Sequence, residues 1–165
     1  MKAMDVEYHI KTVMEKIPET FIILIRRDLS DVSVSLKKGR IKYYNDYDKW
    51  LSMYPIEYER IAHLKGEEQI AAQVFYLNKM IENGVRECFK NRVIEMSLDE
   101  LCENPHGILD KIIEVIGNNQ LKIKNKKDIP KKFLFSTFKN SDEYRRFTYL
   151  LKKLSNENSK QKNEK

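Results

Sequence analysis

The chain has 165 residues and a formal net charge of +6, with 34% charged and 41% hydrophobic residues. This length suits one domain, the apolar content excludes a generally disordered chain, and the longest apolar run, residues 21–25, excludes a membrane-spanning helix. The positive charge favours an anionic partner, namely nucleic acid, a phosphorylated cofactor or acidic lipid, and does not choose among them.

Apolar spacing at the start of the chain predicts an amphipathic helix over residues 5–17. The β-branched run at 21–25 predicts a strand that is buried on both faces, as in a parallel sheet between layers of helices. Asp28 or Ser30 can cap the next helix, which we expect over residues 31–39.

Helices are also expected through the middle of the chain. The basic stretch 37–40 predicts the solvated end of the preceding helix. Aromatic residues recur every three or four positions over residues 41–54, which is typical of a helix, and a short helix should follow over residues 56–65. The longest periodic segment, residues 67–90, predicts a further helix.

A second strand is predicted over residues 92–96, directly before a helix start. Ser97 and Glu100 have the spacing of a capping box, in which the hydroxyl and the carboxylate each satisfy a free backbone N–H. A further helix should begin near Pro105, which a first helical turn accepts, and end at Gly117.

The last part of the chain is basic and polar. Residues 118–127 are rich in Asn and Lys and predict a mobile loop, residues 141–154 predict a last helix, and residues 155–165, without an apolar residue, predict a disordered tail. We therefore divide the chain into an α/β portion over residues 1–117, a basic loop and packed helix over 118–154, and the tail.

The first predicted strand ends at groups suited to an anion. Arg27 follows at its C-terminal edge, where open α/β sheets bind ligands, and the next helix points its first backbone N–H groups the same way. Ser35 lies eight residues after Arg27, early in that helix. A guanidinium holds two phosphate oxygens and a hydroxyl donates to a third, so this pair predicts a site for a phosphate monoester.

These residues resemble the sulfotransferases that use 3′-phosphoadenosine 5′-phosphosulfate as sulfuryl donor. The 3′-phosphate-binding element of that family is a hydrophobic strand followed by Arg-Asp/Asn-Pro-x-Asp-x-x-x-Ser, and the chain matches it at Arg27, Asp28 and Ser35, with Leu29 in place of proline. By this resemblance Arg27 and Ser35 contact the 3′-phosphate of the cofactor, and Asp31 caps or braces the turn.

A second match lies downstream. The family often continues with a strand, Tyr-Glu-Asp-Leu, an Asn/Asp-Pro pair, an amphipathic helix and Phe-Leu-Gly. Residues 92–101, the Asn-Pro pair at 104–105 and residues 112–117 follow in this order, with Leu98 where the family has the Tyr that lies near the adenine. The resemblance covers roughly residues 5–117.

The resemblance implies an α/β fold with a P-loop NTPase-like parallel sheet and flanking helices, here truncated and helix-rich with about two strands. It implies a sulfotransferase that transfers a sulfuryl group from 3′-phosphoadenosine 5′-phosphosulfate to an unknown hydroxyl or amine acceptor. The Gly-rich, Lys-containing loop that holds the 5′-phosphosulfate in the family has no counterpart, because no glycine precedes Lys-Ser or Lys-Thr. We therefore expect the C-terminal part of such a domain, which needs a complementing N-terminal segment or self-association, with its strands either paired directly or separated by an unfilled slot.

Several residues keep a second interpretation. Arg26 either faces the phosphate or meets a carboxylate, and the aromatic residues of 41–54 either line an acceptor pocket or pack in a helical core. The lysines of residues 122–132 either help to hold the phosphate or lie in a solvated loop. The three histidines are isolated in sequence and predict structural or surface roles, so no catalytic residue is identified and no metal-ligand spacing is found.

The alternative function is a non-enzymatic basic helical module that binds nucleic acid or a protein partner, although the chain carries no nucleic-acid-binding signature. The N-terminus has no apolar stretch typical of a signal peptide, and Cys88 and Cys102 form no metal or disulfide pattern. We therefore expect a cytoplasmic protein without a membrane partner.

Overall fold

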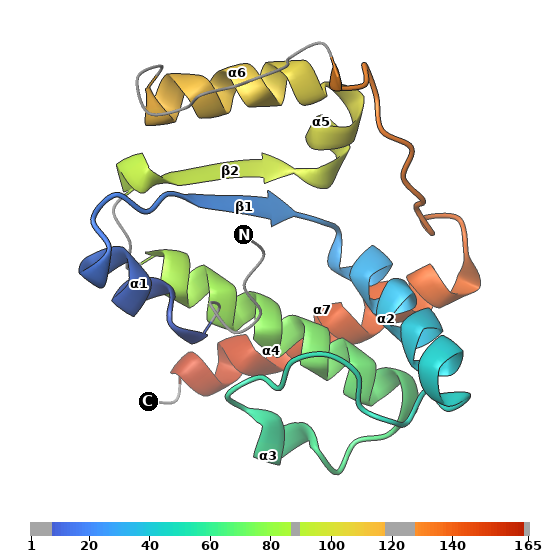
Figure 1. Ribbon diagram of the computed structural model, residues 1–165. Helices are drawn as coiled ribbons and strands as arrows, with labels where there is room; N and C mark the ends of the chain where they lie inside the picture. The colour runs from blue at the N-terminus through green and yellow to red at the C-terminus, as the bar shows by residue number, and fades with distance from the viewer. Residues whose placement is uncertain (1–7, 87–89, 118–127, 164–165) are drawn as a thin grey trace. The chain divides into compact units, whose positions relative to one another are not determined.

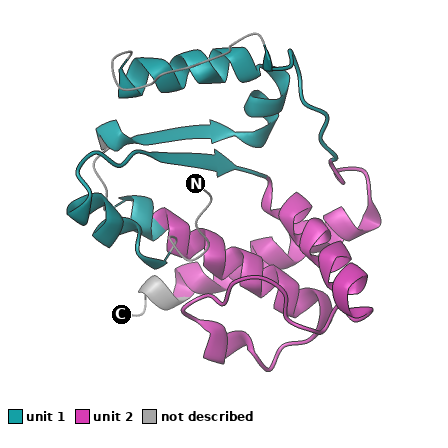
Figure 2. Ribbon diagram, viewed as in Figure 1, with its two compact units in different colours: residues 1–27, 83–136 teal, residues 28–82, 137–165 magenta. Residues whose placement is uncertain are grey.

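The computed structural model describes most of the chain, namely residues 8–86, 90–117 and 128–163. Two compact units are present (Figure 2), each assembled from two separate stretches of sequence. Unit 1 comprises residues 1–27 and 83–136, and unit 2 comprises residues 28–82 and 137–165. The expected mixed α/β, helix-rich character is confirmed, and the sheet of the described residues has two strands.

Unit 1 contains the sheet. Strands β1 (Ile22–Arg26) and β2 (Val93–Ser97) lie side by side and parallel, with Ile22 opposite Val93 and Arg26 opposite Ser97. Both strands begin one residue later than predicted. They pair directly, so of the two arrangements left open for them the structure has the one without an intervening slot (Figure 1).

The faces of β1 differ from the prediction of a strand buried on both sides. Ile23 and Ile25 are 46% and 48% exposed, whereas Ile94 and Met96 of β2 are 2% and 3% exposed. Within unit 1 the apolar side of helix α6 (Pro105–Ile116) packs against β2. The continuous apolar run at β1 therefore does not mean two covered faces, because the α6 side chains cover Ile94 and Met96 of β2 and leave Ile23 and Ile25 of β1 half exposed.

The helix starts after β2 follow the predicted chemistry. Helix α5 (Leu98–Glu103) has a complete capping box, since the Ser97 hydroxyl accepts from the Glu100 N–H and the Glu100 carboxylate accepts from the Ser97 N–H. Asn104 caps α6, whose first residue is the predicted proline. Because a capping side chain satisfies N–H groups that the helix itself leaves free, these residues fix where both helices begin.

Removing the capping hydroxyl gives a prediction for unit 1. We expect Ser97→Ala to lower the free energy of unfolding by about 1 kcal/mol, the usual cost of an N-cap loss. Urea unfolding followed by circular dichroism measures this change. Ser159→Ala, which removes an exposed hydroxyl bonded to the Ser155 carbonyl near the end of a helix, is the control and should change stability far less. Equal effects would show that the capping box is not what stabilises α5.

Unit 2 is helical and has its own core. Its helices are α2 (Leu29–Tyr44), α3 (Tyr58–Ile61), most of α4 (Gly66–Arg86) and α7 (Asp142–Asn163). The last residues of α4 belong to unit 1. The core cluster of Val34, Ile70, Ala71 and Phe147 is fully buried and comes from α2, α4 and α7. The helix predicted over residues 67–90 is thus confirmed as α4, which is described as far as Arg86, and residues 87–89 lie outside the described residues.

The helix predicted over residues 41–54 is wrong. Helix α2 continues to Tyr44 and ends at Asn45, which adopts the left-handed conformation. The aromatic spacing that suggested a helix instead builds a ring cluster: Trp50 stacks on Tyr54 with centroids 5.1 Å apart, and Tyr58 meets both edge-on. The short helix predicted over 56–65 shrinks to α3.

The predicted solvated end at residues 37–40 is also wrong. Arg40 is fully buried, and the Lys37 side chain is 12% exposed. The helix continues through Gly39, and Leu51 packs so closely there that an added Cβ would lie 3.0 Å from its methyl group. Gly39, which suggests a helix end in the sequence, is therefore a position within the helix on which Leu51 packs closely.

The ends of the chain complete the comparison with the sequence. The predicted disordered tail is wrong for residues 155–163, which belong to α7. Lys79 of α4 donates to Asn158 at 2.9 Å, which is a polar contact between this part of α7 and α4. The basic loop predicted over residues 118–127 lies outside the described residues, and helix α1 occupies Ile10–Lys16 of the predicted 5–17.

Candidate anion-binding site

The junction between β1 and α2 forms as the sequence predicts. Asp28 is the N-cap of α2, and its carboxylate accepts from the Asp31 N–H at 3.0 Å. Arg27 is therefore the single residue between the strand and the helix cap. A residue in this position is carried at the carboxyl end of a parallel strand, which is where ligands of α/β sheets bind.

The guanidinium of Arg27 has donors that are not used in hydrogen bonds to the described residues. Its Nη2 donates to the carbonyl of Ser136 at 3.1 Å, within unit 1. Its Nε is buried and has no acceptor among the described residues. Burying a charged donor without an acceptor costs about 1–3 kcal/mol, so an acceptor oxygen that reached this guanidinium would recover part of that cost.

Arg26 has the other role that the sequence left open. Its Nε donates to Glu95 at 2.6 Å, and the two side chains form an ion pair between neighbouring strands. The interpretation that Arg26 meets a carboxylate is confirmed.

Ser35 lies in α2 and its side chain is exposed. The Ser35 hydroxyl has no hydrogen-bond partner among the described residues, so it is available to a ligand. Arg27 belongs to unit 1 and Ser35 to unit 2, and each is positioned by its own unit. The convergence of the pair on one phosphate stays a prediction.

Asp31 braces the turn, as the resemblance implies. It is 4% exposed, and its carboxylate accepts from the Phe138 N–H at 2.7 Å and from the Thr137 hydroxyl at 3.0 Å. Sequence reasoning did not find these partners, because they lie more than a hundred residues away in the chain. The only local signal is an aspartate in a first helical turn, which is common in any helix.

A buried polar network in unit 2 was also missed. Arg40 donates to the side-chain oxygens of Gln69 and Gln73 and to the carbonyl of Tyr47. The two glutamines in turn donate to carbonyls of residues 51–64. Burial lowers the pKa of Arg40, and no carboxylate of the described residues lies within ion-pair distance of it. The network fastens residues 47–64 to α4.

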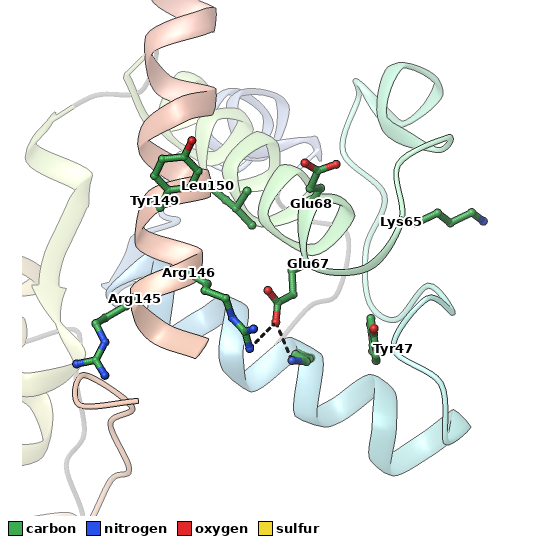
Figure 3. Close-up of a pocket in the computed structure, with 9 residues that line it drawn as sticks. Tyr47, Lys65, Glu67, Glu68, Arg145, Arg146, Tyr149 and Leu150 are labelled. Carbon is green, nitrogen blue, oxygen red and sulfur yellow. Dashed lines mark hydrogen bonds and ion pairs between the residues drawn. The ribbon is translucent and has the colours of Figure 1, made fainter. Parts of the chain in front are cut away.

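A cavity of about 790 Å³ lies in unit 2 and is lined by residues of α2, α4, α7 and the segment between α2 and α4. Figure 3 shows Arg146 facing Glu67, with Lys65 directed away from them. Four cations line the cavity, and four carboxylates line it or pair with those cations: Lys37, Lys65, Arg145 and Arg146 against Glu67, Glu68, Asp142 and Glu143. This balance leaves no surplus positive charge for a phosphate.

Lys37 is the centre of this charge cluster. It donates to Glu67 at 2.8 Å and to Glu143 at 2.7 Å. Although burial alone lowers the pKa of Lys37, its bonds to Glu143 and Glu67 raise it overall, and the bond from Lys37 lowers the pKa of Glu143. The stabilisation that Glu143 contributes is present above the ordinary pKa of Glu and is lost as the pH falls through the lowered pKa of Glu143. The stabilisation that Lys37 contributes is lost as the pH rises through the raised pKa of Lys37.

These shifts predict a pH-dependent effect of Lys37→Met. We expect the variant to be less stable than the parent by about 1 kcal/mol at neutral pH, with the difference shrinking below the pKa of Glu143. Urea unfolding from pH 3 to pH 8 measures this. The exposed Lys49→Met is the control, and a difference that does not change with pH would refute the assignment to Glu143.

The histidines do not gather at a site. His9 and His63 are exposed, and His106 bonds to the Ile129 carbonyl at 3.0 Å. Among the described residues, no group of His, Cys, Asp and Glu is arranged to hold a metal ion, and no helix is long and apolar enough to cross a membrane. Comparisons of the chain with family models, with curated proteins and with solved structures find no match.

Proposed function

We propose that this chain binds the nucleotide of sulfuryl transfer, 3′-phosphoadenosine 5′-phosphosulfate or its product 3′,5′-adenosine bisphosphate, through Arg27 and Ser35. The observation that carries the proposal is the state of Arg27. Arg27 is the residue between a parallel strand and a helix N-cap, and its buried Nε lacks an acceptor among the described residues. A phosphate monoester supplies several acceptor oxygens and two negative charges to such a group.

The neighbouring residues support a phosphate in preference to a carboxylate or a neutral ligand. Arg26 forms an ion pair with Glu95, so it does not compete with Arg27 for the ligand. Ser35 offers a hydroxyl from the helix that follows, and a third donor suits a phosphate better than a two-oxygen group.

Sulfuryl transfer itself needs more than this site. The acceptor oxygen or nitrogen attacks sulfur, the bond from sulfur to the 5′-phosphate oxygen breaks, adenosine bisphosphate leaves, and a base takes the acceptor's proton. The sequence has no Gly-rich loop with Lys-Ser or Lys-Thr for the 5′-phosphosulfate. We therefore propose that this chain anchors the cofactor, and that a complementing segment supplies the 5′-phosphosulfate loop and the base.

Calorimetric titration tests the proposal. We expect 3′,5′-adenosine bisphosphate to bind about 30-fold or more tightly than AMP, because only the bisphosphate carries the group that Arg27 and Ser35 recognise. An oligonucleotide serves as the competing ligand. Equal affinity for AMP and the bisphosphate, or strongly salt-dependent binding of any oligonucleotide in their place, would refute the proposal and favour a basic nucleic-acid-binding module.

The Ser35 hydroxyl gives a smaller, separate prediction. We expect Ser35→Ala to weaken bisphosphate binding about fivefold, the effect of losing one hydrogen bond, and to leave AMP binding unchanged. The same titration measures it, with Ser159→Ala in α7 as the matched loss of an exposed hydroxyl. Unchanged bisphosphate affinity in Ser35→Ala would remove Ser35 from the site.

A further inference from the structure

The first turn of α2 is hydrogen-bonded to residues near the C-terminal end of the sequence. Besides the two bonds that Asp31 accepts from Thr137 and Phe138, the Asp28 carboxylate accepts from the Tyr144 hydroxyl at 3.2 Å. The Ser30 hydroxyl bonds to that of Thr148 at 2.9 Å. All of these residues belong to unit 2. Three polar side chains at the start of α2 thus depend on residues 137–148.

We propose that Thr137 and Tyr144 are positioning residues for the nucleotide site, acting through Asp31 and Asp28. This inference rests on the proposed function and adds a part of the chain that the family resemblance, over residues 5–117, does not reach. The two side chains act on the turn that directly follows Arg27.

Charge gives the physical reason. Two carboxylates at the start of α2 interact well with the helix dipole, but they repel a phosphate bound nearby. Hydrogen bonds from Thr137, Phe138 and Tyr144 hold these carboxylates in place and stabilise their charge. Without those donors, the carboxylates would be free to turn toward Arg27, which is the group that a phosphate needs.

The donors are suited to this role at ordinary pH. Burial and the neighbouring Asp28 raise the pKa of Tyr144, so its phenol stays protonated and donates. Thr137 also accepts from the Lys139 N–H at 3.4 Å, a bond that leaves its hydroxyl proton directed at Asp31.

The test removes each donor without changing the shape of the side chain. Thr137→Val and Tyr144→Phe delete one hydroxyl each, and Thr137→Ser keeps it. We expect the first two to weaken 3′,5′-adenosine bisphosphate binding about fivefold each and to leave AMP binding unchanged, while Thr137→Ser stays within about twofold of the parent. A merely structural role would weaken both nucleotides alike, and circular dichroism confirms that each variant is folded at the temperature of titration.

The outcomes separate the two proposals. If the parent chain binds the bisphosphate and all variants bind it equally well, the positioning role is overturned and the proposed function stands. If Thr137→Val lowers affinity for both nucleotides, or Thr137→Ser fails to restore the affinity for the bisphosphate, the positioning role is also overturned. If the parent chain does not prefer the bisphosphate over AMP, the proposed function falls and this inference falls with it.

Discussion

Arg27→Ala is expected to abolish most of the affinity for 3′,5′-adenosine bisphosphate. Removing a guanidinium that makes two charge-assisted bonds to a phosphate should weaken binding roughly 100-fold, and AMP binding should change little. Calorimetric titration of the variant against both nucleotides measures the effect. The structural cost should be small, because the described residues give Arg27 one hydrogen bond, to the Ser136 carbonyl.

The neighbouring arginine is the matched control. Arg26→Ala removes the same charge one residue earlier, but it breaks an ion pair with Glu95 in which both side chains are partly exposed. Exposed ion pairs contribute less than about 1 kcal/mol. We expect bisphosphate affinity in Arg26→Ala within a factor of about three of the parent, since a general loss of positive charge weakens binding only slightly. Equal losses in the two variants would mean that net charge, and not Arg27, holds the nucleotide.

Arg40→Met is expected to have the largest effect on stability. The variant leaves the oxygens of Gln69, Gln73 and Tyr47 buried without their donor. An acceptor left buried without its donor costs about 1–3 kcal/mol, so the loss of three such bonds should cost several kcal/mol in all. Urea unfolding measures the loss, and limited proteolysis should show cleavage within residues 47–64, which the network fastens to α4.

Two further variants make this prediction specific. Lys42→Met, on the exposed side of the same helix, should leave stability nearly unchanged. Arg40→Lys should recover little, because an ammonium group cannot reach acceptors on three sides as a planar guanidinium does. A stability of Arg40→Met close to that of the parent would show that residues 47–64 are held by the aromatic cluster of Trp50, Tyr54 and Tyr58 instead.

Local chemistry made part of the structure predictable. The strands, the capping box at Ser97, the N-cap at Asp28 and the proline start of α6 follow from residue types at short spacing. Each of these features depends on neighbours within four residues. They include the strand end and helix start that carry Arg27.

Long-range contacts made the rest unpredictable. The sequence around Arg40 suggests a solvated helix end, because the acceptors of Arg40, Gln69 and Gln73, lie about thirty residues away in the chain. The aromatic residues of 41–54 have helical spacing without forming a helix beyond Tyr44, and the rings of Trp50 and Tyr54 pack on each other and on Tyr58. Residues 155–163 lack apolar side chains, yet α7 continues through them with polar contacts. In each case the sequence pattern is present, but contacts with residues distant in the chain determine which structure it forms.

The most direct test of the nucleotide-binding role is a crystal structure of the chain grown with 3′,5′-adenosine bisphosphate. The account predicts the 3′-phosphate within hydrogen-bond distance of both the Arg27 guanidinium and the Ser35 hydroxyl, with Arg26 still paired to Glu95. A nucleotide bound elsewhere, for example in the cavity beside Lys37, or Arg27 and Ser35 facing different surroundings with no phosphate between them, would contradict it.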